Sequence, residues 1–316
     1  MRAVLHTLVL VVVLSSGVAS AAACCLSSSA FGIGRLASWE HTAVQFGFSG
    51  SPVLGRWDAQ GAWKANDTGV GENEWRWQLS ALLALHERVQ LAARVPVVLT
   101  VREVPGQRGT AGGLGDSLLA LRLEPVFQGE YEFLPELAVT LGATLPSGRV
   151  ADANATAALL GTEATGRGAW VFSASLTAEL ARDKWFAQAG AGFTMPIASV
   201  VQGALQQFGP GAQVTLAGGY EVYKDLVTSL VAHFNYEGPL RAEPRDELTG
   251  LPTGGAMVQV ADSQAYDFGV GPSVSYKLDP KWTLQGGLDF FIPAGRLGSN
   301  RQGRITANLG VRFAYF

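Results

Sequence analysis

Cysteine, charge and long apolar runs are all scarce in this sequence. The only two cysteines, Cys24 and Cys25, are adjacent, so a framework of disulfides between distant segments is excluded. Charged residues are 16% of the chain, against about 25% in a typical soluble domain. After residue 23 no apolar run approaches the roughly 20 residues of a membrane-spanning helix. Yet 48% of residues are hydrophobic, so they must be distributed by alternation. Low charge with dispersed apolar residues is typical of a β-barrel whose outside contacts lipid.

The sequence also lacks the features of a nucleic-acid partner or a catalyst. The formal net charge is −3, so no basic field favours nucleic acid. His233 and Ser229 are four residues apart on a predicted strand, about 13 Å, which is too far for a hydrogen bond. His86 falls in a predicted turn, where it is expected to be solvated. No nucleophile-elbow, zinc-protease or metal-spaced motif occurs, so the sequence predicts no enzyme, no cofactor and no metal.

The N-terminus carries targeting information. Residues 1–23 have a positive start, a short apolar core and a small-residue end, which together predict a cleaved export signal. Residues 24–39 are interpreted as an N-terminal leader, with an exposed stretch at 26–34. A lipid anchor on Cys24 or Cys25 is an alternative, although Ala21 or Ala22 stands where such signals usually have Leu.

Residues 75–102 carry the clearest pattern in the chain. Trp75, Trp77, Leu79, Ala81 and Leu83 alternate with more polar residues, and the alternation resumes after a break near residues 87–88. A period of two predicts strands with one apolar and one polar face, so this stretch is a hairpin.

The same unit repeats to the C-terminus. We expect eleven strands from residue 75 onward and one more within residues 40–64, giving about 12 strands in a barrel over residues 40–316. A hidden extra pair at 40–64 would give 14. Short turns at 87–88, 128–132, 182–184, 224–225 and 279–281 alternate with longer loops at 65–73, 104–113, 147–167, 199–211, 238–263 and 293–302. This asymmetry is typical of outer-membrane barrels, with turns in the periplasm and loops outside.

The alternation also assigns the two faces. A spanning β-structure must close, because lipid offers no partner to an unpaired backbone group. An Arg or Lys on the lipid face costs about 2–4 kcal/mol at the midplane. We therefore expect one parity class to line the lumen: Arg76, Arg94, Arg102, Arg122, Glu124, Glu136, Glu179, Glu221, His233, Asp267, Lys277, Asp289, Arg304 and Arg312.

Two further features fit a barrel in the outer membrane. Trp75, Trp77, Trp185 and Trp282 are expected to form lipid-facing aromatic girdles, and the last two follow short turns. A C-terminal Phe is the usual signal for the barrel-assembly machinery, and Phe316 fits. Leu309, Val311 and Phe313 have the opposite parity to Phe316, so a bulge or frayed end is expected.

Three short motifs resemble a known family. They are residues 83–91 (LALHERVQL), 113–119 (GLGDSLL) and 145–148 (LPSG). They resemble the outer-membrane transporters of phenol-degradation meta-pathways, the MetA-like family, over residues 75–316. Glu87 and Ser147 replace the usual Asp and Thr. The resemblance implies a bacterial outer-membrane barrel that admits small, often hydrophobic compounds.

The state of the lumen stays open at this point. About twelve strands enclose more space than side chains fill in an eight-stranded barrel. One interpretation is an open or gated pore without strong ion selectivity, because the lumenal charges have both signs. The other is a barrel occluded by its own side chains, loops or N-terminus, with a structural or surface role. An outer-membrane hydrolase is the weakest alternative.

Overall fold

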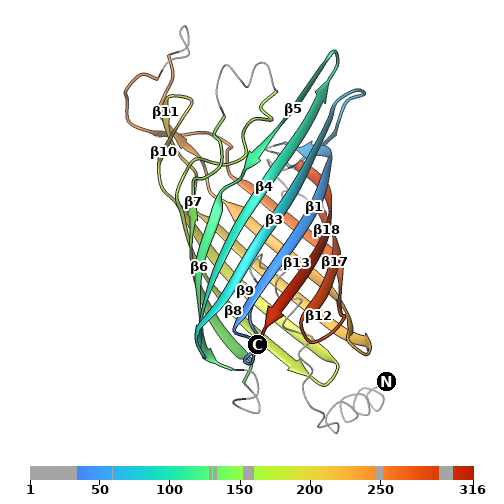
Figure 1. The fold of residues 1–316 in the computed structure, drawn as a ribbon. Coiled ribbons are helices and arrows are strands. Elements are labelled where there is room, and N and C mark those ends of the chain that lie inside the picture. Colours follow the sequence, from blue (N-terminus) through green and yellow to red (C-terminus); the bar gives the residue numbers. More distant parts are fainter. Residues whose placement is uncertain are drawn as a thin grey trace, which may run out of the picture.

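A single antiparallel sheet, closed on itself, dominates the molecule (Figure 1). The computed structural model describes residues 34–58, 60–127, 130, 134–151, 160–246, 252–291 and 302–316. The predicted export signal and both cysteines lie outside these residues. No helix in the described ranges is long and apolar enough to cross a bilayer. The predicted all-β class is confirmed.

Twelve strands form the wall, as predicted. In chain order they are β1 (Thr42–Trp57), β3 (Gly71–His86), β4 (Val89–Val104), β6 (Ser117–Val126), β7 (Glu136–Leu145), β8 (Val171–Arg182), β9 (Trp185–Pro196), β12 (Gly211–Tyr223), β13 (Leu226–Glu237), β16 (Ala265–Lys277), β17 (Trp282–Phe291) and β18 (Gln302–Tyr315). Each wall strand pairs with its sequence neighbours, and β18 pairs with β1 from Thr42↔Tyr315 to Arg56↔Gln302. That pairing closes the cylinder and removes both sheet edges.

Residues 40–64 contribute one wall strand. β1 spans Thr42–Trp57, and the short β2 (Trp63–Ala65) folds back on its end rather than entering the wall. The count of 12 therefore holds and the alternative of 14 is excluded.

The two ends of the barrel differ. At the end that carries the C-terminus, which we name the turn end, Asp183 and Asp225 adopt left-handed φ angles of 50° and 63° in tight hairpin turns. Asp tolerates this conformation better than most residues, which suits a two-residue turn. Longer connections occupy the opposite end, the loop end. The short turns predicted at 87–88, 182–184 and 224–225 are present between β3 and β4, β8 and β9, and β12 and β13.

Three predicted loops contain strands. Residues 104–113 were expected to be a loop, but β5 (Gln107–Leu114) pairs with β4 from Val97 to Val104. The predicted loops at 199–211 and 238–263 contribute a small separate sheet at the loop end, made of β10 (Ser199–Val201), β11 (Ala204–Gln207), β14 (Arg241–Ala242) and β15 (Val258–Gln259). The Gly and Pro content of these segments suggested loops. In the structure β5 pairs with the last part of β4, and the other two segments form the second sheet.

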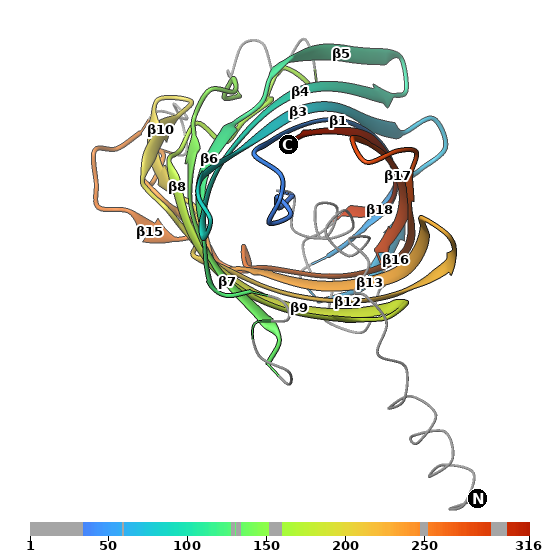
Figure 2. The same cartoon turned by 60° about the horizontal axis from the view of Figure 1, so that its bottom comes forward.

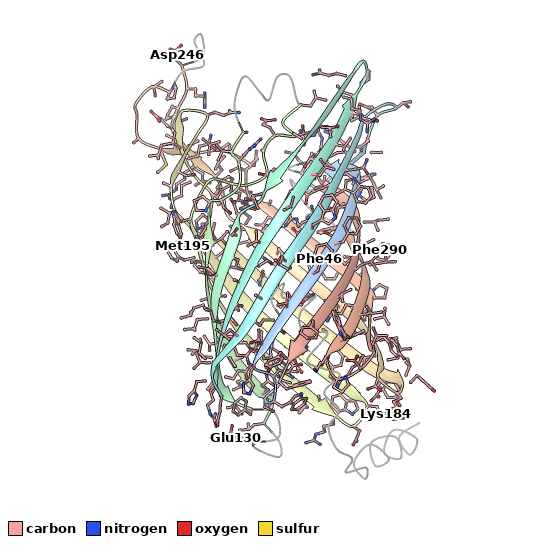
Figure 3. All side chains as sticks on the ribbon, in the orientation of Figure 1. Phe46, Glu130, Lys184, Met195, Asp246 and Phe290 are labelled. Carbon is pink, nitrogen blue, oxygen red and sulfur yellow. The ribbon has the colours of Figure 1, made fainter. Side chains whose placement is uncertain are left out.

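Alternation along the strands separates an apolar outside from a polar inside. On β12, Val214 and Leu216 are 46% and 56% exposed, while Thr215 between them is 3% exposed. Figure 3 shows Phe46, Met195 and Phe290 on the wall, with Lys184 at the turn end and Asp246 at the loop end. Among these labelled side chains, the apolar ones lie on the wall and the charged ones at its ends.

Candidate functional site in the barrel lumen

The chain before β1 turns into the barrel instead of lying outside it. Residues 34–40, which we name the lumenal segment, lie within the ring of strands near the C-terminus (Figure 2). Gly34 was predicted to end an exposed leader, but it is buried, so that expectation is wrong at the one described residue of residues 26–34. The rest of the described part of the predicted leader, residues 35–39, precedes β1 within the same ring. The wall provides polar partners that hold this segment.

Inward-facing alanines make room for the lumenal segment. Leu36 is 2% exposed and packs against Leu82 and against small side chains on four strands, Ala43, Ala92, Ala120 and Ala314. Larger residues at these positions would fill the space that Leu36 occupies. Four inward alanines at one level of the wall therefore form a socket for one leucine.

Arg35 links the lumenal segment to carboxylates of the wall. Its guanidinium pairs with Glu136 on β7 and donates to Glu179 on β8 at 3.0 Å. Arg122 donates to the second oxygen of Glu136 at 3.0 Å and to Glu124 at 2.6 Å. The side chains of Arg35, Glu136 and Glu179 are 6% exposed or less. Buried charges need partners, and here the segment and the wall provide them for each other.

The amide of Gln90 extends this network to the backbone of the segment. Its Oε1 accepts the N–H of Leu36 at 2.9 Å, and its Nε2 donates to Glu124 at 3.0 Å. The network therefore fixes both the side chain of Arg35 and the backbone beside it.

Glu40 and Arg312 form a second anchor. Arg312 Nη1 donates to Glu40 Oε1 at 2.9 Å, and Nη2 also pairs with the Glu40 carboxylate. Arg312 further donates to the carbonyl of Arg35 at 3.3 Å. The last strand thus holds the residues that precede the first strand.

A cavity of about 470 Å³ lies in the part of the lumen nearer the loop end. Arg76, His233, Asp289 and Arg304 line it, all from the set predicted to face the lumen. Arg76 pairs with Glu74 at 2.9 Å, and His233 Nε2 lies 3.8 Å from Asp289 Oδ2. The Arg304 guanidinium lies 4.9 Å from the centre of the Phe291 ring.

The other predicted residues lie at different levels of the barrel. Asp267 accepts from Asn235, which lines the cavity, at 2.6 Å. Arg102 donates to Glu72 at 2.9 Å near the loop end. Arg94 lies opposite Ser80 on β3, whose side chain is buried on the inner face. At the turn end, Glu221 accepts the N–H of Asp225 at 3.0 Å, and the Lys277 N–H donates to the Asp225 carbonyl.

The four predicted girdle tryptophans fall at two levels. Trp75 stacks on Phe48 with ring centres 5.7 Å apart, and Trp77 contacts the same ring, in the half of β3 nearer the loop end. Trp185 and Trp282 begin β9 and β17 just after turns, and Trp282 contacts Phe313. Phe316 follows the last residue of β18, while Leu309 and Val311 point outward.

Two of the family-like motifs meet at the loop end. Ser147 Oγ donates to the Gly115 carbonyl at 2.8 Å and accepts the N–H of Ser117 at 2.9 Å. Asp116 Oδ1 accepts the N–H of Gly148 at 3.0 Å. The GLGD and LPSG stretches therefore form one hydrogen-bonded corner where β6 and β7 leave the wall.

The His233–Asp289 pair does not form a nucleophilic triad with the nearest serine on its strand. Ser229 Oγ lies 2.6 Å from Ser273 Oγ and is four residues from His233 along β13. Among the described residues, no group of three or more His, Cys, Asp or Glu side chains is arranged to hold a metal. Hydrolytic chemistry has no support in the part of the chain that is described.

Ionisable groups outside the spanning segments stabilise the turn end. Arg88 donates to Glu130 at 3.0 Å, and this hydrogen bond lowers the pKa of the Glu130 carboxyl, with further help from the Phe127 N–H. Both side chains are partly exposed, so the pair is a surface feature.

A closed cylinder with an apolar belt and a polar interior defines a membrane-spanning β-barrel of the outer-membrane type. No family model matches the chain, and no curated protein matches it. Among solved structures, it is similar to the COG4313 outer membrane channel from Pseudomonas putida F1, with 14% identity and a TM-score of 0.67, over 87% of this chain and 96% of that one.

Other similarities are weaker. The translocator domain of the autotransporter NalP from Neisseria meningitidis matches with 8% identity and a TM-score of 0.47, over 92% of each chain. The KdgM porin in complex with disordered oligogalacturonate matches with 9% identity and a TM-score of 0.43, over 87% of this chain and 99% of that one. The likeness to the Pseudomonas channel confirms the fold that the family resemblance implied.

Proposed function

We propose that this protein is a bacterial outer-membrane channel for small solutes, in which residues 34–40 limit passage at the turn end. The observation that carries the proposal is a polar lumen with a cavity on the loop-end side of the lumenal segment. Ion pairs and hydrogen bonds hold this segment against the wall. Polar side chains pointing away from lipid are useful to a protein that conducts water and solutes.

The lumenal segment bears on the two states of the lumen that the sequence left open. It narrows the pore while its ion pairs are intact, and its departure would widen the pore. We therefore favour a gated channel, with the inward residues of the predicted set as its lining. A permanently occluded barrel with a structural role is the competing function, because the same segment would then be a fixed plug.

The remaining assignments complete the proposal. Export through the signal at residues 1–23 would bring the chain to the outer membrane, where the assembly machinery would recognise the last strand and Phe316. The tryptophans at two levels would lie at the two lipid–water interfaces. No role as a catalyst is proposed.

Planar-bilayer conductance of the purified, folded protein tests this function. We expect ion current through the wild-type protein and a larger current when the lumenal segment is released by Arg35→Ala. Absence of current from both proteins, each shown to be folded by heat-modifiable migration in gels, would favour the structural barrel.

A further inference from the structure

Neutral polar side chains make up much of the lining of the cavity in the lumen. Six amide side chains point into it from β1, β3, β12, β13, β17 and β18: Gln45, Gln78, Gln213, Asn235, Gln285 and Asn308. Five hydroxyl side chains join them: Ser49, Ser51, Thr215, Ser273 and Thr306. Each amide offers donors and an acceptor, and each hydroxyl can act as either. The wall is therefore dense in neutral hydrogen-bonding groups.

The charges around the cavity are close to balance. Two arginines, two carboxylates and one histidine line it, and the Glu74–Arg76 and His233–Asp289 contacts bring opposite charges together. Arg304 stacks against Phe291. A charged solute would gain little from such a field and would lose its hydration on entering.

Glycines on the inner face border the cavity, and they have different roles: Gly47 leaves space beside it, whereas Gly271 permits the close approach of β17, because a Cβ there would overlap the Leu288 carbonyl. Gly47, Gly271, Gly287 and Gly310 line the cavity, and a Cβ at Gly47 would meet no atom nearer than 3.8 Å. Gln45 Nε2 donates to Gln285 Oε1 at 3.1 Å. Both amides lie beside Gly310, which has no side chain to occupy the space between them. The volume of about 470 Å³ is within the roughly 300–1,000 Å³ of small-molecule sites.

We propose that this cavity is a binding site for a small neutral polyhydroxylated solute, such as a monosaccharide, on its way through the barrel. The inference deepens the proposed channel function, and passage of the solute through the barrel rests on that function. Hydroxyl groups of such a solute replace water at the amides and the Ser and Thr side chains, and no charge has to be buried. The hydrophobic solutes that the family resemblance implied are a poorer match to this lining.

Glucose is the probe for the test, with gluconate as its charged counterpart and toluene as an apolar comparator. Saturation-transfer NMR on the full-length protein in detergent measures binding without requiring current. Planar-bilayer recording measures the fall in ion current as glucose is added. We expect glucose to give both signals and gluconate and toluene to give neither at the same concentration.

Variants locate the binding. Gln78→Leu, Gln213→Leu and Gln285→Leu together keep the side-chain volume close to that of the wild type and remove three amides, so glucose affinity is expected to fall about tenfold or more. Gln60→Leu, on an exposed loop residue, is the matched control and should leave affinity unchanged. Should the triple variant misfold, Gly47→Leu fills the cavity from a position with free space, and it should abolish glucose binding.

The outcomes separate the two proposals. Ion current without any effect of glucose would leave the channel standing and overturn the polyol site. Glucose binding without current would support the site and contradict the channel. Binding of toluene instead of glucose, or wild-type glucose affinity in both the triple variant and Gly47→Leu, would overturn the site.

Discussion

Asp116 accepts the backbone N–H of Gly148 at 3.0 Å and so joins the start of β6 to the chain leaving β7. Its other oxygen accepts the N–H of Arg167 at 2.7 Å. A Cβ at Gly148 or Gly166 would press against Asp116, so both glycines permit the close approach. One carboxylate thus connects three segments at the loop end.

Asp116→Asn should loosen this corner. An amide has only one acceptor oxygen, so one of the two backbone N–H groups loses its partner, at a cost of about 1–3 kcal/mol. Urea unfolding in lipid vesicles measures the loss, and faster hydrogen exchange at Gly148 or Arg167 locates it. Asp67→Asn, on an exposed loop, is the control. Unchanged exchange at both amides would show that Asp116 does not hold the corner.

Arg35→Ala should release the lumenal segment. The change leaves Glu136 and Glu179 in the wall without the cation that both contact. We expect higher single-channel conductance and more frequent long openings in planar bilayers. Arg56→Ala removes an exposed arginine from β1 near the loop end and should conduct like the wild type. Equal conductance in the two variants would argue against a gate held by Arg35.

Glu40 and Arg312 should behave as a coupled pair. Arg312→Ala leaves the buried Glu40 carboxylate without its cation, and removing one partner of a buried pair costs about 3–5 kcal/mol. Glu40→Ala with Arg312→Ala should cost clearly less than the sum of the two single changes. A double-mutant cycle by urea unfolding measures the difference. Additive losses would mean that the two side chains do not interact.

An arginine introduced on the outer face should lower the free energy of unfolding more than one introduced on the inner face. Leu216→Arg, at a lipid-facing position of β12, is expected to destabilise the barrel by about 2–4 kcal/mol. Gln213→Arg lies on the same strand but points into the cavity, where water is available. Unfolding free energies in lipid vesicles compare the two. A larger loss for Gln213→Arg would reverse the assignment of the faces.

Two glycines in the lumen should tolerate alanine differently. A Cβ at Gly269 would overlap the His233 imidazole, whereas one at Gly47 would have free space. Gly269→Ala should displace His233 from Asp289 and cost about 1–3 kcal/mol, as overpacking does. Gly47→Ala should change stability little. Thermal unfolding followed by circular dichroism distinguishes them, and equal midpoints would contradict the crowding at His233.

Strand alternation predicted the barrel because it is a local property. Each inward or outward position depends only on parity within one strand, as at Thr215 between Val214 and Leu216. The hairpin arm of β5 was missed because glycines were interpreted as loop residues. Gly112 is needed there for another reason, since a Cβ would press against the Val98 carbonyl of the paired strand.

Occlusion by the N-terminus was one alternative from the sequence, but residues 34–40 could not be placed in the lumen because they have no period of their own. Its contacts join Arg35 to residues more than 100 positions away, and only the closed fold brings them together. A weak signal did exist. The inward residues at the turn end include Glu124, Glu136 and Glu179 on neighbouring strands, with Arg122 as the cation that pairs with two of them, so carboxylates outnumber cations there. The inward alanines of β1, β4, β6 and β18 were a second sign of something to be accommodated.

The contact between Glu40 and Arg312 also orders events during biogenesis. Arg312 belongs to the final strand, which pairs with β1 to complete the seam. The Glu40–Arg312 contact can therefore form only after β18 has paired with β1. A chain truncated before β18 would lack both the strand that closes the wall and the arginine that holds Glu40.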